Sequence, residues 1–188
     1  MTRVADDATI SKLARQQNDV FRRVREGSLL PERVFRMHRA LLGTLLVPFN
    51  PARSWEDAVK AGRYDDVFIA HDFNPAIHLP PPLTGGSQGA EITLRTQDMT
   101  TTTAQWLNLL GDGKKSGQQF AHPLVVLAVG EHEPDEQLDA PIFTVWRAAG
   151  RLWSLILDDV AVGHDLSVDC GSPGDDWNAR YRAAAVTM

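Results

Sequence analysis

The spacing of apolar residues changes near Tyr64, and that change limits the folds open to this chain. Before this point, apolar side chains recur every three or four residues, as they do on amphipathic helices. Beyond it they alternate with polar residues or form short runs rich in branched side chains, as in strands. Helices first and strands later indicate an α+β fold rather than a parallel α/β sheet. We predict a helical N-terminal segment over residues 1–64 and a mainly antiparallel β-rich domain with one short helix over residues 65–188.

Local signals place the individual elements. Ser54 and Gly62 are suited to begin and end a helix over residues 55–61, and the threonines at 100–103 provide a cap for a helix ending at Gly111. In the head, apolar stripes predict two further helices, the second reaching Leu45. The predicted strands cover residues 67–70, 92–96, 124–129, 142–147 and 151–157, with short strands at 160–162 and 166–168. The segment 182–186 fits either a strand or a helix.

Composition excludes several classes of protein. Hydrophobic residues make up 43% of the chain, which is typical of a globular protein. A single cysteine, Cys170, excludes an internal disulfide and fits a reducing compartment. No apolar stretch approaches the length of about 18 residues that a membrane span requires, and the N-terminus has no signal-peptide core. We therefore expect a cytoplasmic protein without a membrane partner.

Charge is distributed unevenly along the chain. Residues 1–60 hold eleven Lys and Arg against seven Asp and Glu, whereas residues 121–188 hold four against eleven. The basic head permits nucleic-acid binding through Arg22, Arg23, Arg36 and Arg39. The alternative, which the overall charge of −5 favours, is that head and tail attract each other within one fold or one dimer.

Motifs for catalysis or metal binding fit this chain poorly. Ser87 lies in a G-x-S-x-G pattern, but a proline run precedes it and a predicted strand follows it, so a flexible loop explains the pattern better than a hydrolase elbow. The glycines and lysines of residues 111–117 lack the spacing of a phosphate-binding loop. His71 and His78 are seven residues apart, not four as in a helical metal pair. Residues 131–139 are acidic, as a charged hairpin loop would be. We expect no enzyme activity, no cofactor and no metal.

The C-terminal part carries an unusual set of side chains. Three of the five tryptophans, the cysteine and many aspartates follow Phe143. Aromatic, acidic, amide and guanidinium side chains on turns braced by a sheet are typical of a recognition surface. An acidic sheet edge without a ligand would have the same composition.

Three blocks of the chain resemble a group of bacterial proteins. They are residues 13–34, residues 49–64 and the closing residues 166–182, which include Asp169-Cys170-Gly171 and Trp177-Asn178-Ala179. Their ends resemble those of target proteins of diversity-generating retroelements, in uncharacterised proteins of uncultivated bacteria. The resemblance implies a C-type-lectin-like fold whose variable surface binds a ligand. Ala179 stands where the lectin triplet has a calcium-binding aspartate, so calcium is not expected.

These observations lead to one functional interpretation and one alternative. The first is a non-enzymatic protein that binds a protein or small-molecule ligand through a C-terminal surface. The alternative is a nucleic-acid-associated or regulatory protein that uses its arginine-rich head. The ligand-binding residues that we expect are Asp169, Ser172, Asp175, Asp176, Trp177, Asn178, Arg180 and Tyr181.

Overall fold

The computed structural model describes residues 44–81, 90–111, 117–159 and 163–187, together with residues 19, 22, 23 and 25–28. The chain divides into one unit over residues 1–43 and another over residues 44–188. In the first unit, Arg22 contacts Asp19 at 2.6 Å and Glu26 at 2.8 Å, at helical spacing. The remainder of the predicted head helices, with Arg36 and Arg39, lies outside the described residues. Nucleic-acid binding by the head therefore stays a prediction.

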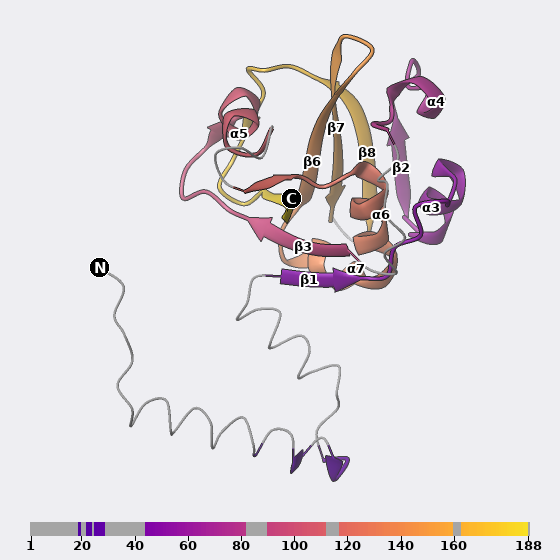
Figure 1. The fold of residues 1–188 in the computed structure, drawn as a ribbon, viewed down its shortest axis with the longest axis vertical. Helices are drawn as coiled ribbons and strands as arrows, with labels where there is room; N and C mark the ends of the chain where they lie inside the picture. The colour runs from indigo at the N-terminus through magenta and orange to yellow at the C-terminus, as the bar shows by residue number, and fades with distance from the viewer. Residues whose placement is uncertain are drawn as a thin grey trace. The chain divides into compact units, whose positions relative to one another are not determined.

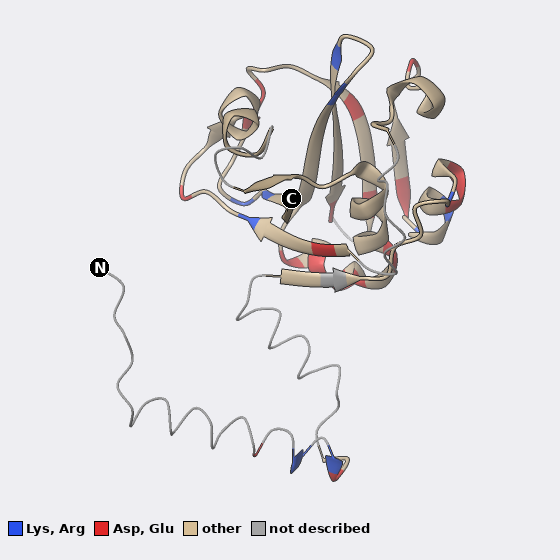
Figure 2. Ribbon diagram, viewed as in Figure 1, with Lys and Arg blue, Asp and Glu red and all other residues tan. Residues whose placement is uncertain are grey.

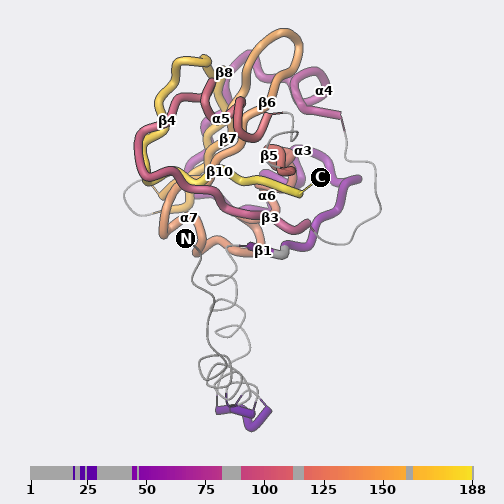
Figure 3. Tube along the Cα trace, turned by 60° about the vertical axis from the view of Figure 1, so that its left-hand side comes forward, coloured from indigo at the N-terminus to yellow at the C-terminus, as the bar shows by residue number. Residues whose placement is uncertain are grey.

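The second unit is built on a mixed sheet flanked by helices (Figure 1). Its strand order is β1-β3-β10-β6-β7-β8-β2, and β5 also pairs with β10. The strands are β1 (Thr44–Val47), β2 (Asp66–Ile69), β3 (Ala90–Arg95), β5 (Gln118–Phe120), β6 (Ile142–Ala148), β7 (Arg151–Asp158), β8 (Asp165–Gly171) and β10 (Arg182–Thr187). A separate ribbon pairs β4 (Thr101–Thr102) with β9 (Asp176–Trp177), and Figure 3 shows the C-terminal chain running beside β4 there.

Within the described residues of this unit, five helices pack on the sheet. They are α3 (Trp55–Ala61), α4 (Pro75–His78), α5 (Thr103–Leu110), α6 (Pro123–His132) and α7 (Pro134–Asp139). Within the part of the chain that the structure describes, no helix is long and apolar enough to cross a membrane. The contacts group β1 and α3 with the sheet unit, although the sequence placed both in the helical head.

Two hydrophobic clusters lie on opposite faces of the β6–β7 hairpin. One contains Trp146 and Trp153 together with the buried residues of α6. The other contains Phe143 and Val145, covered by Trp106 of α5 and Trp177 of β9. Cross-strand partners alternate between the faces, which is why Trp146 lies opposite Trp153 while Phe143 lies opposite Ile156.

Several local predictions are confirmed. The bounds of α3 are those predicted, with the Ser54 hydroxyl accepting from the backbone N–H of Asp57. In α5, Thr102 and Gln105 form a reciprocal capping box. The predicted hairpin turn consists of Ala149 and Gly150, whose φ angles of 49° and 75° are those of a tight turn that matches the sheet twist.

Other predictions are wrong. The apolar run 124–129 is helix α6 and not a strand, because an almost fully buried helix is apolar on every side and so lacks helical periodicity. Residues 134–139 form α7 instead of a hairpin loop, so the described part of residues 65–188 contains four helices rather than one. Leu45 belongs to β1 and not to a helix. The prediction of a mainly antiparallel sheet holds for most strand pairs, but β10 pairs with β6, and β2 with β8, in parallel. The predicted strand at 160–162 lies outside the described residues.

The position of the Tyr64 side chain explains why residues 62 and 130 are glycines. A Cβ at Gly62 would lie 2.3 Å from the Tyr64 ring, and a Cβ at Gly130 would lie 2.3 Å from its hydroxyl oxygen. That hydroxyl is buried without a hydrogen-bond partner among the described residues. Burial raises the pKa of Tyr64, so the group stays neutral.

We expect Gly130→Ala to lower the free energy of unfolding by about 1–3 kcal/mol, because overpacking outweighs the gain of about 1 kcal/mol that alanine brings to a helix. In a Tyr64→Phe background the loss should be smaller, since the clashing hydroxyl is gone. Chemical denaturation of the four variants measures both effects. Equal losses in the two backgrounds would show that the hydroxyl is not the obstacle.

His122 caps α6 and also holds the segment that contains Pro80. Its Nδ1 accepts from the backbone N–H of Leu124 at 3.2 Å, while Nε2 lies 3.2 Å from the carbonyl oxygen of Pro80. Both contacts are satisfied by the neutral ring that carries its proton on Nε2. Burial lowers the pKa of His122 below its ordinary value of 6.5.

The lowered pKa of His122 makes stability depend on pH. Below pH 6.5 the unfolded chain takes up a proton that the folded chain does not, so the free energy of unfolding falls as the pH drops toward the folded pKa. In His122→Asn the amide oxygen still caps the helix but does not titrate. Denaturation between pH 5 and 8 should therefore show a shallower decline for the variant than for the wild type. Parallel curves would contradict this assignment.

Candidate functional site

The first C-terminal turn, which joins β8 to β9, is fixed by hydrogen bonds. The Asp175 carboxylate accepts from the backbone N–H of Ser172 at 2.6 Å. The carbonyl oxygens of Asp175 and Pro173 accept from the N–H groups of Thr103 and Ala104, both at 2.9 Å. N–H groups in the first turn of a helix have no acceptor within the helix. Here they bind the backbone carbonyls of the turn, so the start of α5 holds the turn in place.

The second turn, between β9 and β10, has its own bracing. The side-chain oxygen of Asn178 accepts from the N–H of Arg180 at 2.9 Å, and its carbonyl oxygen accepts from Tyr181 at 3.1 Å. The Arg180 guanidinium lies 3.3 Å from the Asp159 carboxylate. Asn178 and Arg180 are both exposed.

Trp177 is a core residue, which corrects its expected place on the recognition surface. It is 7% exposed and stacks on Phe143 with a centroid distance of 4.0 Å and an interplanar angle of 9°. Its indole N–H donates to the Thr103 hydroxyl at 2.7 Å. A side chain held in this way cannot contact a ligand.

Tyr181 lies at the boundary between the core and the surface. Its half-buried ring packs edge-on against Trp177 at 5.3 Å. Burial raises the pKa of Tyr181, and the charge of nearby Asp158 adds to the shift. The structure thus leaves six of the eight expected residues exposed and brings Tyr181 close to Asp158.

Sequence reasoning missed a row of carboxylates across three strands. Asp158 of β7 lies opposite Asp165 of β8, and Asp165 lies opposite Asp66 of β2. Neighbouring strands are about 4.8 Å apart, and cross-strand partners share a face. The aspartates at the strand ends are visible in the sequence, but the pairing of β2 with β8 joins segments about 100 residues apart and is not.

The next row on the same face is mostly apolar. Ile156 lies opposite Ser167, and Ser167 lies opposite Phe68, which is 56% exposed. One row further along, Asp169 lies opposite Ser154. A Cβ at Gly171 would lie 3.5 Å from the Asp175 carboxylate, so this face leads to the first turn. We call this face the acidic shelf; its residues are Asp66, Phe68, Asp158, Asp165, Ser167 and Asp169. Figure 2 shows acidic residues in red on both β2 and β8.

The other expected motifs have local partners. His78 accepts from the N–H of Asn74 at 2.9 Å and stacks on Trp153. Arg151 pairs with Asp72. Arg53 pairs with Glu131 and holds the pKa of that carboxyl below its ordinary value. Among the described residues, no three His, Cys, Asp or Glu side chains are grouped as metal ligands. Ser87 lies outside the described residues.

The comparisons with known proteins give no family. No protein-family model, curated protein or solved structure matches the chain. The resemblance to retroelement target proteins stays a prediction, and nothing supports the finer expectation of a C-type-lectin-like fold.

We expect Trp177→Ala to lower the free energy of unfolding by about 3–5 kcal/mol, because it removes a large buried ring and leaves a cavity. The matched control is Asp176→Ala, a change at the exposed neighbouring position of the same strand, which should alter stability by at most about 0.5 kcal/mol. Thermal and urea denaturation measure both. A nearly unchanged melting temperature for Trp177→Ala would contradict the assignment of this residue to the core.

Proposed function

We propose that this protein is a non-enzymatic binding protein whose ligand is a cationic peptide segment of a partner protein. The ligand lies on the acidic shelf and reaches the two C-terminal turns. The observation that carries this proposal is the row formed by Asp158, Asp165 and Asp66 across adjacent strands.

Such a row is unfavourable in the free protein. Like charges directly opposite each other on neighbouring strands destabilise a sheet. Among the described residues, no Lys or Arg pairs with any of these three carboxylates. Their known side-chain hydrogen bonds are local: Asp66 accepts from Val67, and Asp158 accepts from Asp159. A bound cation would remove the repulsion, so the row favours a positively charged ligand over a neutral or anionic one.

Phe68 supports a Lys or Arg side chain as the cation. The face of this exposed ring, which lies beside carboxylates, can contact the charged group of a Lys or Arg side chain. Its apolar surface can also contact the methylene groups of that side chain. Half-buried Tyr181, near Asp158, provides a second ring at the other side of the shelf. A small inorganic cation would bind the carboxylates but would make no use of the aromatic rings.

The turns beside the shelf support the interpretation of a variable surface. Backbone groups of Pro173 and Asp175, together with buried Trp177, attach this segment to α5. Exposed side chains such as those of Asp176 and Ala179 make none of the contacts that hold the turns. Their identities can change without loss of the turn, which is what a recognition surface that differs between related proteins needs.

We expect octalysine to bind the wild-type protein at low ionic strength and to bind less tightly as salt increases. Replacing Asp66 and Asp165 by asparagine should weaken binding about tenfold, since each charge pair contributes up to about 1 kcal/mol. Phe68→Ser should weaken binding further without changing the net charge. Isothermal titration calorimetry measures the affinities.

The matched control replaces Glu56 and Asp98, exposed carboxylates outside the shelf, by glutamine and asparagine. This variant loses the same charge and should bind octalysine like the wild type. Asp165→Asn alone should raise the free energy of unfolding by about 0.2–1 kcal/mol, which also tests the repulsion. Equal weakening in the control and shelf variants would falsify the shelf as the binding site.

A further inference from the structure

The sheet divides into two arms at β10, and the division leaves a cavity. On one side β10 pairs with β6 through Arg182 and Ala183 only. Further along the same strand, Ala185–Thr187 pair with β5 instead. One arm therefore continues from β6 through β7, and the other contains β10 with β5 and β3.

A buried hydrogen bond closes the base of the division. The hydroxyl of Thr144 on β6, 0% exposed, donates to the carbonyl oxygen of Ala121 at 2.6 Å. Ala121 directly follows β5, so this bond ties the two arms together where they begin to separate. Beyond it lies a cavity of about 500 Å³, within the size range of small-molecule sites.

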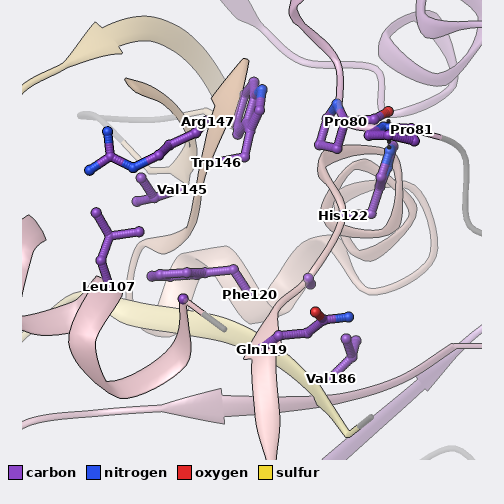
Figure 4. Close-up of a pocket in the computed structure, with 12 residues that line it drawn as sticks. Pro80, Pro81, Leu107, Gln119, Phe120, His122, Val145, Trp146, Arg147 and Val186 are labelled. Carbon is purple, nitrogen blue, oxygen red and sulfur yellow. Dashed lines mark hydrogen bonds between the residues drawn. The ribbon is translucent and has the colours of Figure 1, made fainter. Parts of the chain in front are cut away.

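The walls of this cavity are mainly apolar. Val145 and Trp146 line it from β6, while Phe120 and Val186 line it from the other arm (Figure 4). Leu107 of α5 lies at one end. These side chains can enclose the body of an apolar ligand but leave few polar groups to orient it.

A short segment with Pro80 and Pro81 forms the opposite end. It is fixed by the bond between His122 and Pro80 and by the Trp146 indole N–H, which donates to the carbonyl oxygen of His78 at 2.5 Å. A second cavity of about 580 Å³ shares Pro80, Pro81, His122 and Arg147 with the first. The wall is therefore held in place before any ligand binds.

The charged residues among the described lining of the two cavities are arginines, although the protein as a whole is acidic. Among the described residues that line them, there is no Asp or Glu. Arg147 lines both cavities, and within the described ranges it forms no ion pair. Arg53, in the second cavity, is paired with Glu131. Among the described lining residues, Arg147 is thus the cation available to a ligand of the first cavity, and Figure 4 shows it beside Val145.

The backbone of β6 adds donors on the same side. The N–H of Arg182 donates to Pro141 at 2.8 Å, so the carbonyl of Pro141 faces β10. Backbone groups alternate in direction along a strand, so those of Val145 and Arg147 also point toward the β10 side of β6. Both residues lie beyond Phe143, the last residue of β6 that pairs with β10.

We propose that this cavity binds a small amphipathic carboxylate. Its apolar body lies between Trp146 and Phe120, and its carboxylate meets the guanidinium of Arg147 at the edge. An arginine fork matches the two oxygens of a carboxylate, whereas an uncharged polar group would leave that match unused. The site is independent of the acidic shelf, which has the opposite charge and takes the opposite class of ligand.

The test compares 4-phenylbutyrate with its neutral amide, 4-phenylbutyramide, by isothermal titration calorimetry on the full chain. We expect the carboxylate to bind at least about tenfold more tightly than the amide. Arg147→Gln should remove this preference while leaving weak binding of both compounds. Lys60→Gln, an equal charge change on the exposed side of α3, should leave the preference intact.

A second variant tests the cavity itself. Val186→Phe places a ring in the space and should abolish binding of both compounds, and the melting temperature shows whether the variant is folded. The Trp146 indole N–H resonance, followed by NMR, should shift when 4-phenylbutyrate is added to the wild type. Absence of binding at millimolar concentration, a preference that survives Arg147→Gln, or wild-type affinity in a folded Val186→Phe would each overturn the proposal.

Discussion

The β6–β7 hairpin is buried on both faces, and the helices and the remaining strands are arranged around it. Five consecutive residues of β6, Ile142–Trp146, are buried, so the strand needs cover on both sides. Helix α6 provides it on one face, and α5 with the β4–β9 ribbon provides it on the other. Each face contributes its own aromatic cluster, around Trp153 and around Phe143. The free energy of folding is therefore concentrated at the centre of the sheet.

Both proposed sites lie where this cover ends. The second cluster reaches Ile156 but does not extend over β8 and β2, so Ser167 and Phe68 remain accessible and form the acidic shelf. In the other direction, β10 follows β6 for two residues and then turns to β5, which opens the cavity. A sheet that was covered along its whole width, or paired without interruption, would have neither feature.

The two sites also reduce the stability of the fold in different ways. The shelf keeps like charges opposite each other, which costs stability in the free protein. The cavity leaves the sides of its apolar lining residues that face it without packing partners among the described residues. Features that reduce the stability of a fold, such as these two, are often found at functional sites.

Elements whose signals are local could be predicted from the sequence alone. The cap at Ser54, the capping box at Thr102 and the turn at Ala149–Gly150 depend on neighbouring residues, so α3, α5 and the hairpin were predictable. The sequence also indicated an acidic C-terminal surface on turns. Tertiary structure alone decided the rest. The run 124–129 is apolar because it is buried on every side, and a continuous run does not distinguish a helix from a strand. Trp177 is a core residue because Phe143 and Thr103 surround it, and the aspartate row exists because β2 pairs with β8, a segment about 100 residues away. Such contacts join distant parts of the chain, and the spacing of residues along a sequence carries no record of them.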